Sequence, residues 1–294
     1  MPASRAARIC VVLFTGGNVN LSGREQRARG RVAIGVVAMP WNDWLSAQPA
    51  TVSGQLSIVD LRDTGGLDDK AVIAMLGREL RRNYVDPKAL EVLFNDLGAP
   101  QVAAHIRNRV LPTDNKVRIG EFGETVATAL FRLSYQYSVP ILKLRFKDSP
   151  NDPMKGTDLL AFRLRATPPV VAAPEVKTHT QTRRSLDLGK KAEHSLSIAL
   201  ARLDESINFV VRMLTTQGHT ALAVRIGQIM LGTRIVERHM VFVHESSSFS
   251  QEMMTRLEAA LAGPTTAHVL RLDGLADLIN AAYLAAENDL QAAP

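Results

Sequence analysis

Residues 170–178 read VVAAPEVKT, an apolar run that ends in an acidic and a basic residue. The two valines at its start suit a strand that is buried within a sheet. Because successive side chains of a strand point to opposite faces, Glu175 and Lys177 lie on one face while Val176 packs on the other. The segment therefore predicts a core strand that carries an acid–base pair near its carboxyl end.

A second acidic residue stands upstream of this strand. Residues 154–158 read MKGTD, and the apolar residues that follow predict a strand over 157–164. The proline pair at 168–169 suits a connection between two strands rather than a strand interior. If the two strands pair antiparallel, Asp158 lies near Glu175 and Lys177.

A helix with two glutamates precedes both strands. Residues 120–124 read GEFGE, and apolar residues recur at helical spacing after them, which predicts a helix over 121–137. Glu121 and Glu124 are three residues apart and share a face of this helix. At the start of a helix, both carboxylates are also stabilised by the helix dipole. Glu124 is the stronger candidate for a site, because the apolar stripe that faces the sheet follows it directly.

The order of elements from residue 120 onward predicts the fold class. A helix is followed by strands over 139–147, 157–164 and 170–178, by helices over 185–232, and then by a strand, a helix, a strand and a closing helix. This alternation is typical of an α/β fold with a mixed sheet. A turn cluster at 112–115 divides an N-terminal accessory α+β region, 1–115, from a core domain, 116–294.

Composition limits the function classes. The 294 residues carry a net charge of +6, which is compatible with a polyanionic partner but does not require one. Cys10 is the only cysteine in the sequence, so an intrachain disulfide and a cysteine-based zinc site are excluded, and a reducing cytoplasm fits. Because no apolar run has the length of a membrane span, we expect a soluble protein with no membrane partner.

The three acidic positions suit one kind of chemistry. Mg²⁺, or Mn²⁺ in its place, prefers hard oxygen ligands. Asp158 and Glu175 offer two carboxylates, the Val176 carbonyl offers another oxygen, and Glu124 or Glu121 can reach the metal or its water. The metal would polarise a phosphodiester and acidify the attacking water. Lys177 would orient that water and stabilise the charge that develops on the phosphate.

Basic residues flank these positions. Residues 142–147 alternate strictly between apolar and basic, which predicts a strand with a cationic face. Cations on such a face suit contacts with nucleic-acid phosphates. The candidate phosphate-binding residues are Lys143, Arg145, Lys147, Lys155, Arg183 and Arg184.

Two other interpretations remain open at this point. The acidic and basic residues can form ordinary ion pairs at a strand end, and the cationic strand can be a solvated sheet face, which describes a purely structural protein. Alternatively, the chain is a non-catalytic adaptor that binds nucleic acid or a partner protein through its basic surface. Convergence of Asp158, Glu175 and Lys177 on one surface would favour the enzyme, because an adaptor has no need of all three.

The ordered motifs also carry a resemblance. The sequence GEFGE at 120–124, KLRFKDS at 143–149, MKGTD at 154–158 and EVK at 175–177 resembles the effector nuclease subunits of Hachiman-type anti-phage defence systems, a branch of the PD-(D/E)xK nuclease superfamily. The resemblance covers mainly residues 80–290 and is densest over 120–178. The first 65 residues show no feature that can be tied to that family.

This resemblance implies a metal-dependent DNA endonuclease with a restriction-endonuclease-like core at 116–294. It implies that Glu124, or Glu121, supplies the helix carboxylate, that Asp158 and Glu175 hold the metal, and that Lys177 is the catalytic lysine. It also implies a partner, a superfamily 2 helicase subunit of the same defence system, which senses aberrant DNA and restrains the nuclease.

Overall fold

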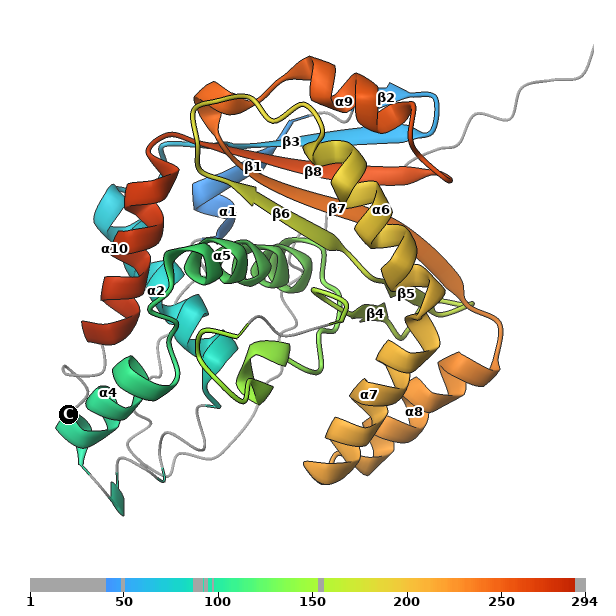
Figure 1. Ribbon diagram of the computed structural model, residues 1–294. Coiled ribbons are helices and arrows are strands. Elements are labelled where there is room, and N and C mark those ends of the chain that lie inside the picture. Colours follow the sequence, from blue (N-terminus) through green and yellow to red (C-terminus); the bar gives the residue numbers. More distant parts are fainter. Residues whose placement is uncertain are drawn as a thin grey trace, which may run out of the picture. The chain divides into compact units, whose positions relative to one another are not determined.

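The computed structural model describes residues 41–48, 51–86, 92, 95–96, 98–152 and 156–288. Contacts along the chain separate residues 1–38 from a second unit, 39–294, and all elements below belong to that second unit. Among the described residues, eight strands form one mixed sheet (Figure 1). They are β1 (Leu45–Ala47), β2 (Thr51–Ser53), β3 (Leu56–Asp63), β4 (Ala161–Arg163), β5 (Val170–Ala172), β6 (Glu175–His179), β7 (Ile235–Glu245) and β8 (Thr265–Leu272).

The strand order is β1-β3-β8-β7-β5-β4, with β2 paired to β3 and β6 paired to β7. The pairs β3–β8, β8–β7, β7–β6 and β7–β5 are parallel. The short strands β1, β2 and β4 pair antiparallel with their neighbours. The prediction of an α/β fold with a mixed sheet is therefore confirmed.

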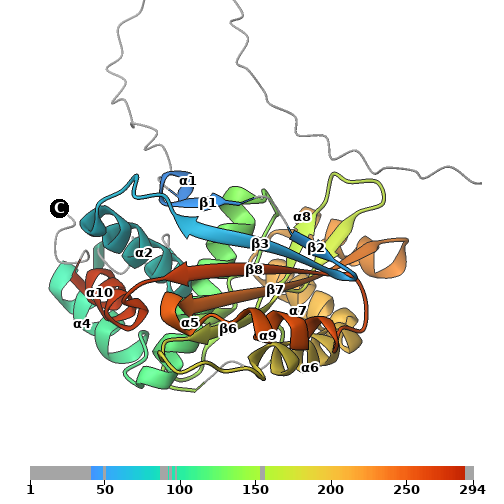
Figure 2. The ribbon, with the colours of Figure 1, turned by 90° about the horizontal axis from the view of Figure 1, so that it is seen from above.

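Helices cover both faces of the sheet. They are α1 (Trp41–Trp44), α2 (Asp69–Tyr84), α4 (Ala99–Arg109), α5 (Asn115–Ala129), α6 (Leu188–Ala201), α7 (Leu203–Thr216), α8 (Thr220–Leu231), α9 (Gln251–Glu258) and α10 (Leu275–Asn288). Helices α2, α5 and α10 lie on one face, and α6 and α9 lie on the other (Figures 1 and 2). No helix among the described residues is both long and apolar enough to cross a membrane.

Strand β7 is the centre of the core because its two faces enter different apolar clusters. Val241 and Val243 pack with residues of α2, α5 and α10. Met240 and Phe242 alternate with them and pack with residues of α6 and α9. The hairpin of α7 and α8 packs separately, against Phe162 of β4 and neighbouring apolar residues. This arrangement places β6 between α5 and α6, beside the predicted site.

The sheet also includes the N-terminal strands. Strand β3 pairs with β8 in parallel over seven residues, from Leu56 opposite Thr265 to Arg62 opposite Arg271. The sheet therefore crosses the expected division between residues 1–115 and 116–294. Both parts contribute strands to the same sheet, and the division into an accessory region and a core domain stays a prediction.

The predicted strand over 139–147 is wrong. Residues Lys143–Phe146 form a single 3₁₀ turn, η2, and Ser138 makes only an isolated bridge to Phe162. The alternation of apolar and basic residues is real, with Leu144 buried in the core. The basic side chains, however, bond to carboxylates and carbonyls of other elements instead of lining a solvated face. Ion pairs with other segments of the chain thus outweigh the local strand pattern of residues 142–147.

The two following strands are shorter than predicted. Residues 157–164 yield only β4, and Asp158 lies in the bend before it. Residues 170–178 yield β5 and β6, which are separated at Ala173 and Pro174. Because proline has no backbone N–H to donate, it interrupts the strand. The antiparallel pairing of β4 with β5 is confirmed, with Ala161 opposite Ala172.

The helix predicted over 121–137 begins six residues earlier. Asp114 is the N-cap of α5, and its side chain accepts a hydrogen bond of 2.9 Å from the Val117 amide. A π-helical turn, η1 (Leu130–Ser134), follows α5. Glu121 and Glu124 therefore stand in the middle of the helix, so the expected stabilisation by the helix dipole is wrong. Burial and neighbouring charges control these carboxylates instead.

Gly123 allows α5 to approach β6 closely. A Cβ at this position would lie 2.0 Å from Oγ1 of Thr178 and 3.1 Å from Cγ1 of Val176. Gly120, one turn earlier, is exposed and has no atom within 4 Å of the corresponding position. The absence of a side chain at 123 thus sets the distance between the helix that carries Glu124 and the strand that carries Glu175.

We expect Gly123→Ala to destabilise the protein by about 1–3 kcal/mol, because the added methyl group overpacks the contact with β6. Gly120→Ala is the matched control and is expected to stabilise by about 0.5–1 kcal/mol, since alanine favours a helix interior. Urea unfolding of both variants measures the two effects. Equal effects of the two substitutions would contradict the close approach described here.

Candidate active site

Asp158 is held beside the Glu175–Lys177 strand by a backbone hydrogen bond. Its Oδ2 accepts a bond of 2.9 Å from the Val176 amide. The antiparallel pairing of β4 with β5 brings the segment before β4 alongside the start of β6, which is why a residue 18 positions away can make this contact. The predicted proximity of Asp158 to the Glu-x-Lys segment is therefore present in the fold.

Glu175 and Lys177 form an ion pair at the start of β6. Nζ of Lys177 lies 2.6 Å from Oε1 of Glu175. The glutamate side chain is 8% exposed and the lysine side chain 25%, so the acid is enclosed while the ammonium reaches solvent. Ser195 of α6 contributes a further hydrogen bond to Glu175. Helix α6 thus stabilises the position of the Glu175 carboxylate.

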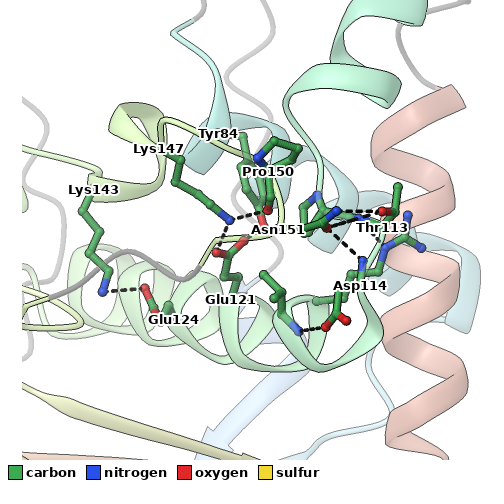
Figure 3. Close-up of polar contacts among 12 residues, drawn as sticks. Tyr84, Thr113, Asp114, Glu121, Glu124, Lys143, Lys147, Pro150 and Asn151 are labelled. Atoms are coloured by element: carbon green, nitrogen blue, oxygen red, sulfur yellow. Dashed lines mark hydrogen bonds and ion pairs between the residues drawn. The ribbon is translucent and has the colours of Figure 1, made fainter.

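Glu124 completes the cluster from the side of α5. Its Oε2 lies 3.1 Å from Nζ of Lys143, and the same Nζ lies 3.5 Å from Oδ1 of Asp158. Figure 3 shows Glu124 and Lys143 facing each other across the gap between α5 and η2. One buried ammonium therefore bridges two of the predicted metal-binding carboxylates.

Glu121 points to a different network. Its carboxylate accepts hydrogen bonds from Tyr84 and Lys147, and Lys147 also donates to the Pro150 carbonyl at 2.6 Å (Figure 3). Tyr84 continues the network to the Tyr283 hydroxyl at 3.0 Å. Glu121 is thus bonded away from Asp158, whereas Glu124 shares the Lys143 ammonium with it.

A cleft of about 640 Å³ opens over the cluster. Glu124, Lys143, Asp158 and Glu175 line it on one side, and α6 and α7 form the opposite wall, which includes Phe209. A second, more open hollow of about 560 Å³ adjoins it and contains Lys177, Lys190, Lys191 and His194. Ser195 lines both, so the acidic cleft and the basic hollow meet at the Glu175–Lys177 pair.

The predicted phosphate-binding residues have different environments. Lys143 and Lys147 pair with Glu124 and Glu121, and Nη1 of Arg145 lies 2.6 Å from Asp86. All three side chains are less than one-fifth exposed. Arg183 and Arg184 are exposed, and Lys155 lies outside the described residues. A role for these six residues in nucleic-acid binding stays a prediction.

Burial raises the proton affinity of two of the carboxylates. It raises the pKa of Glu175 to about 7, with the Asp158 charge adding to the rise and Lys177 opposing it. It raises the pKa of Glu124 to about 8, where Lys143 opposes the rise and Asp158 adds to it. Burial lowers the pKa of Lys143, but the Glu124 and Asp158 charges outweigh burial, and the net shift is upward. Carboxylates with raised pKa values in a cleft are typical of functional sites.

The carboxylates fit a hard divalent cation in the chemistry of their oxygen donors. Asp158, Glu175 and Glu124 offer oxygen donors from three elements around one cleft, and two of them are ionised incompletely near neutral pH unless a cation stabilises their charge. As they stand, no three His, Cys, Asp or Glu side chains of the described residues are close enough together to hold a metal. Lys143 Nζ takes up part of the space between Glu124 and Asp158.

The raised pKa of Glu175 predicts a pH-dependent stability. Its pKa of about 7 in the folded chain exceeds the ordinary 4.5, so the folded state binds more protons than the unfolded state between these values. The contribution of Glu175 to stability is therefore lost as pH rises through 7. We expect Glu175→Gln, which does not titrate, to gain on the order of 1–3 kcal/mol relative to the wild type between pH 5 and 8.

Urea unfolding of both proteins in EDTA at pH 5 and pH 8 measures this gain. The same stability difference at both pH values would show that the Glu175 carboxyl has an ordinary pKa.

Sequence reasoning missed two members of the cluster. Lys143 was predicted to contact phosphates from the face of a strand, with a solvated face as the alternative. Ser195 lies within a helix whose sequence offers no local sign of contact with Glu175. For Lys143, the signal was present in the sequence as a lysine close to several predicted acidic ligands, but strand periodicity was given more weight.

Comparison with known proteins places the chain in one family. None of the curated proteins compared with it matches. The family model described as HamA matches residues 40–283, which include every element from α1 to the greater part of α10. The matched range also includes Glu124, Asp158, Glu175 and Lys177. The chain therefore belongs to the HamA family and is a component of a Hachiman defence system, as the resemblance of its ordered motifs implied.

Proposed function

We propose that this chain is a metal-dependent DNA endonuclease with a PD-(D/E)xK core and that it is the effector of its Hachiman complex. The observation that carries the proposal is the hydrogen bond from the Val176 amide to Asp158, which fixes this carboxylate beside Glu175 and Lys177 at a cleft. Family membership supports the defence role. The convergence of two acids and one base from separate segments supports the chemistry.

Each residue of the cluster has a task in this proposal. Asp158 and Glu175 would hold Mg²⁺ or Mn²⁺, and Glu124 would bind the ion directly or through a water molecule. The bound ion supplies Lewis-acid polarisation of the phosphate and a more acidic water. Lys177, whose Nζ is held at Glu175 and reaches solvent, donates hydrogen bonds to the attacking water and to the phosphate oxygens.

The basic hollow beside the cluster suits the path of the nucleic-acid backbone. Lys190 and Lys191 are exposed in the first turn of α6 and, with Lys177, line this hollow. Arg183 and Arg184 are exposed on the segment that leads into α6. Contacts of these side chains with phosphates would position the strand without reading its sequence.

The defence context suggests the partner and the location. Family membership and the resemblance of the motifs support a superfamily 2 helicase as the subunit that senses DNA and restrains the nuclease. We place the complex in the cytoplasm, where invading DNA is met and where a chain with a single cysteine in its sequence is suited to reducing conditions.

The inward orientation of the cationic turn weighs against a non-catalytic adaptor on that surface. Lys143, Arg145 and Lys147 are committed to carboxylates of α5 and to Asp86. An adaptor built on these residues would have to break these ion pairs, and those of Lys143 and Lys147 are buried. In the enzyme hypothesis the exposed cations of the basic hollow, Lys190 and Lys191, can contact the phosphates instead.

Plasmid degradation tests the proposal. The purified chain, alone and together with the helicase subunit of its system, is incubated with plasmid DNA in Mg²⁺, in Mn²⁺ and in EDTA. We expect nicking or linearisation with either metal and none in EDTA. Failure to cut under all of these conditions, including linear and single-stranded DNA with the complex, would contradict the proposed activity.

A further inference from the structure

Lys143 and Lys147 are both buried, but their ammonium groups have different kinds of partner. In the described part of the chain, Nζ of Lys143 contacts two carboxylates and nothing else, Glu124 at 3.1 Å and Asp158 at 3.5 Å. Nζ of Lys147 contacts Glu121 and also donates to the Pro150 carbonyl. The Lys147 ammonium is thus held by a backbone carbonyl as well as by a carboxylate, whereas the contacts of the Lys143 ammonium are to carboxylates.

Lys143 also borders empty space. Its side chain is 12% exposed and lines the cleft of about 640 Å³ together with both of its partners. The long, flexible side chain can therefore leave the carboxylates and enter the cleft without crossing packed residues. When a buried ion pair opens directly onto a cavity, its ammonium group can be replaced by another cation.

Simple electrostatics make this exchange competitive. Two like charges a few ångströms apart in a buried site repel strongly, so the ammonium and a divalent ion do not both remain between Glu124 and Asp158. Binding of the metal through these carboxylates must therefore include the cost of displacing the lysine. The Lys143 contact lowers the affinity of the site for metal by that amount.

We propose that Lys143 is an internal counter-ion that occupies the Glu124–Asp158 part of the site in the metal-free chain and that a divalent cation must displace it. This inference rests on the proposed function, because it concerns the same site. In this role Lys143 is a positioning residue: it keeps the carboxylates in place before metal binds and sets the metal concentration at which the site loads.

Calorimetric titration of the full chain with Mn²⁺ tests the proposal without measuring cleavage. The proteins are the wild type, Lys143→Met, Lys143→Gln and the control Lys116→Met, which removes one exposed charge from α5. We expect the dissociation constant for Mn²⁺ to fall at least about tenfold in both Lys143 variants. Lys116→Met is expected to match the wild type. Lys143→Gln retains a hydrogen-bond donor and serves as the test if Lys143→Met does not fold.

The outcomes separate this inference from the proposed function. Equal or weaker Mn²⁺ binding in the Lys143 variants, with binding that Asp158→Asn abolishes, would overturn the counter-ion role and leave the metal site intact. A tenfold gain in Lys116→Met as well would also overturn it, because the effect would then reflect net charge. No Mn²⁺ binding by any of the proteins would overturn both proposals.

Discussion

Glu175→Gln is expected to reduce DNA cleavage by at least about 10³-fold while the protein stays folded, a loss that corresponds to about 4 kcal/mol in the activation barrier. The substitution removes a carboxylate that is 8% exposed and lines the cleft beside Asp158. A neutral amide binds a divalent cation far more weakly, and it no longer holds the Lys177 ammonium through a charged contact. Initial rates of plasmid nicking in Mg²⁺ measure the effect.

Glu252→Gln is the matched control for this experiment. It makes the same chemical change in an exposed glutamate of α9 that pairs with Arg256, a residue of the same helix, at 2.7 Å. We expect cleavage by this variant to stay within about twofold of the wild type, because exposed pairs of this kind contribute little. If Glu175→Gln cuts as fast as Glu252→Gln, the site lies elsewhere in the chain.

Lys147→Met is expected to destabilise the protein by about 3–5 kcal/mol, the largest effect on stability that we predict. Both members of the Lys147–Glu121 pair are 5% exposed, so the substitution leaves a buried carboxylate without its cation. The Pro150 carbonyl loses a donor as well. Urea unfolding at pH 7 measures the loss, and Lys116→Met, which is exposed, is expected to change stability by less than about 0.5 kcal/mol.

A second substitution separates the buried charge from simple loss of packing. In Lys147→Met/Glu121→Gln the side chain at 121 is neutral and can still accept a hydrogen bond from Tyr84. We therefore expect the double variant to recover about 2 kcal/mol of the stability that Lys147→Met loses. No recovery would mean that the lysine stabilises the turn through packing and the bond to Pro150.

The sequence predicts the part of the acidic and basic cluster that is formed by segments close together along the chain. Strand periodicity placed Glu175 and Lys177 together, and the short connection between β4 and β5 brought Asp158 to the same strand. The helix before them was also predicted, although its start was not, because the N-cap Asp114 lies within what reads as a turn cluster.

The remaining features depend on contacts between distant parts of the chain. Nothing near β3 indicates that it pairs with β8, about 200 residues later. The pattern at 142–147 matches a strand, but the partners that decide its structure, Glu121 and Glu124, belong to another element. A periodicity argument counts only local neighbours, so it cannot distinguish a cation that faces solvent from one that faces a buried carboxylate.

The central claim is that Asp158 and Glu175 bind one divalent cation. Anomalous diffraction from crystals of the full chain grown or soaked in Mn²⁺ tests it most directly. We predict an anomalous peak within coordination distance of both carboxylates, with Nζ of Lys143 moved away from Asp158. The claim would be contradicted by anomalous peaks for Mn²⁺ at other positions only. It would also be contradicted if no peak lies at these two carboxylates at Mn²⁺ concentrations that support cleavage.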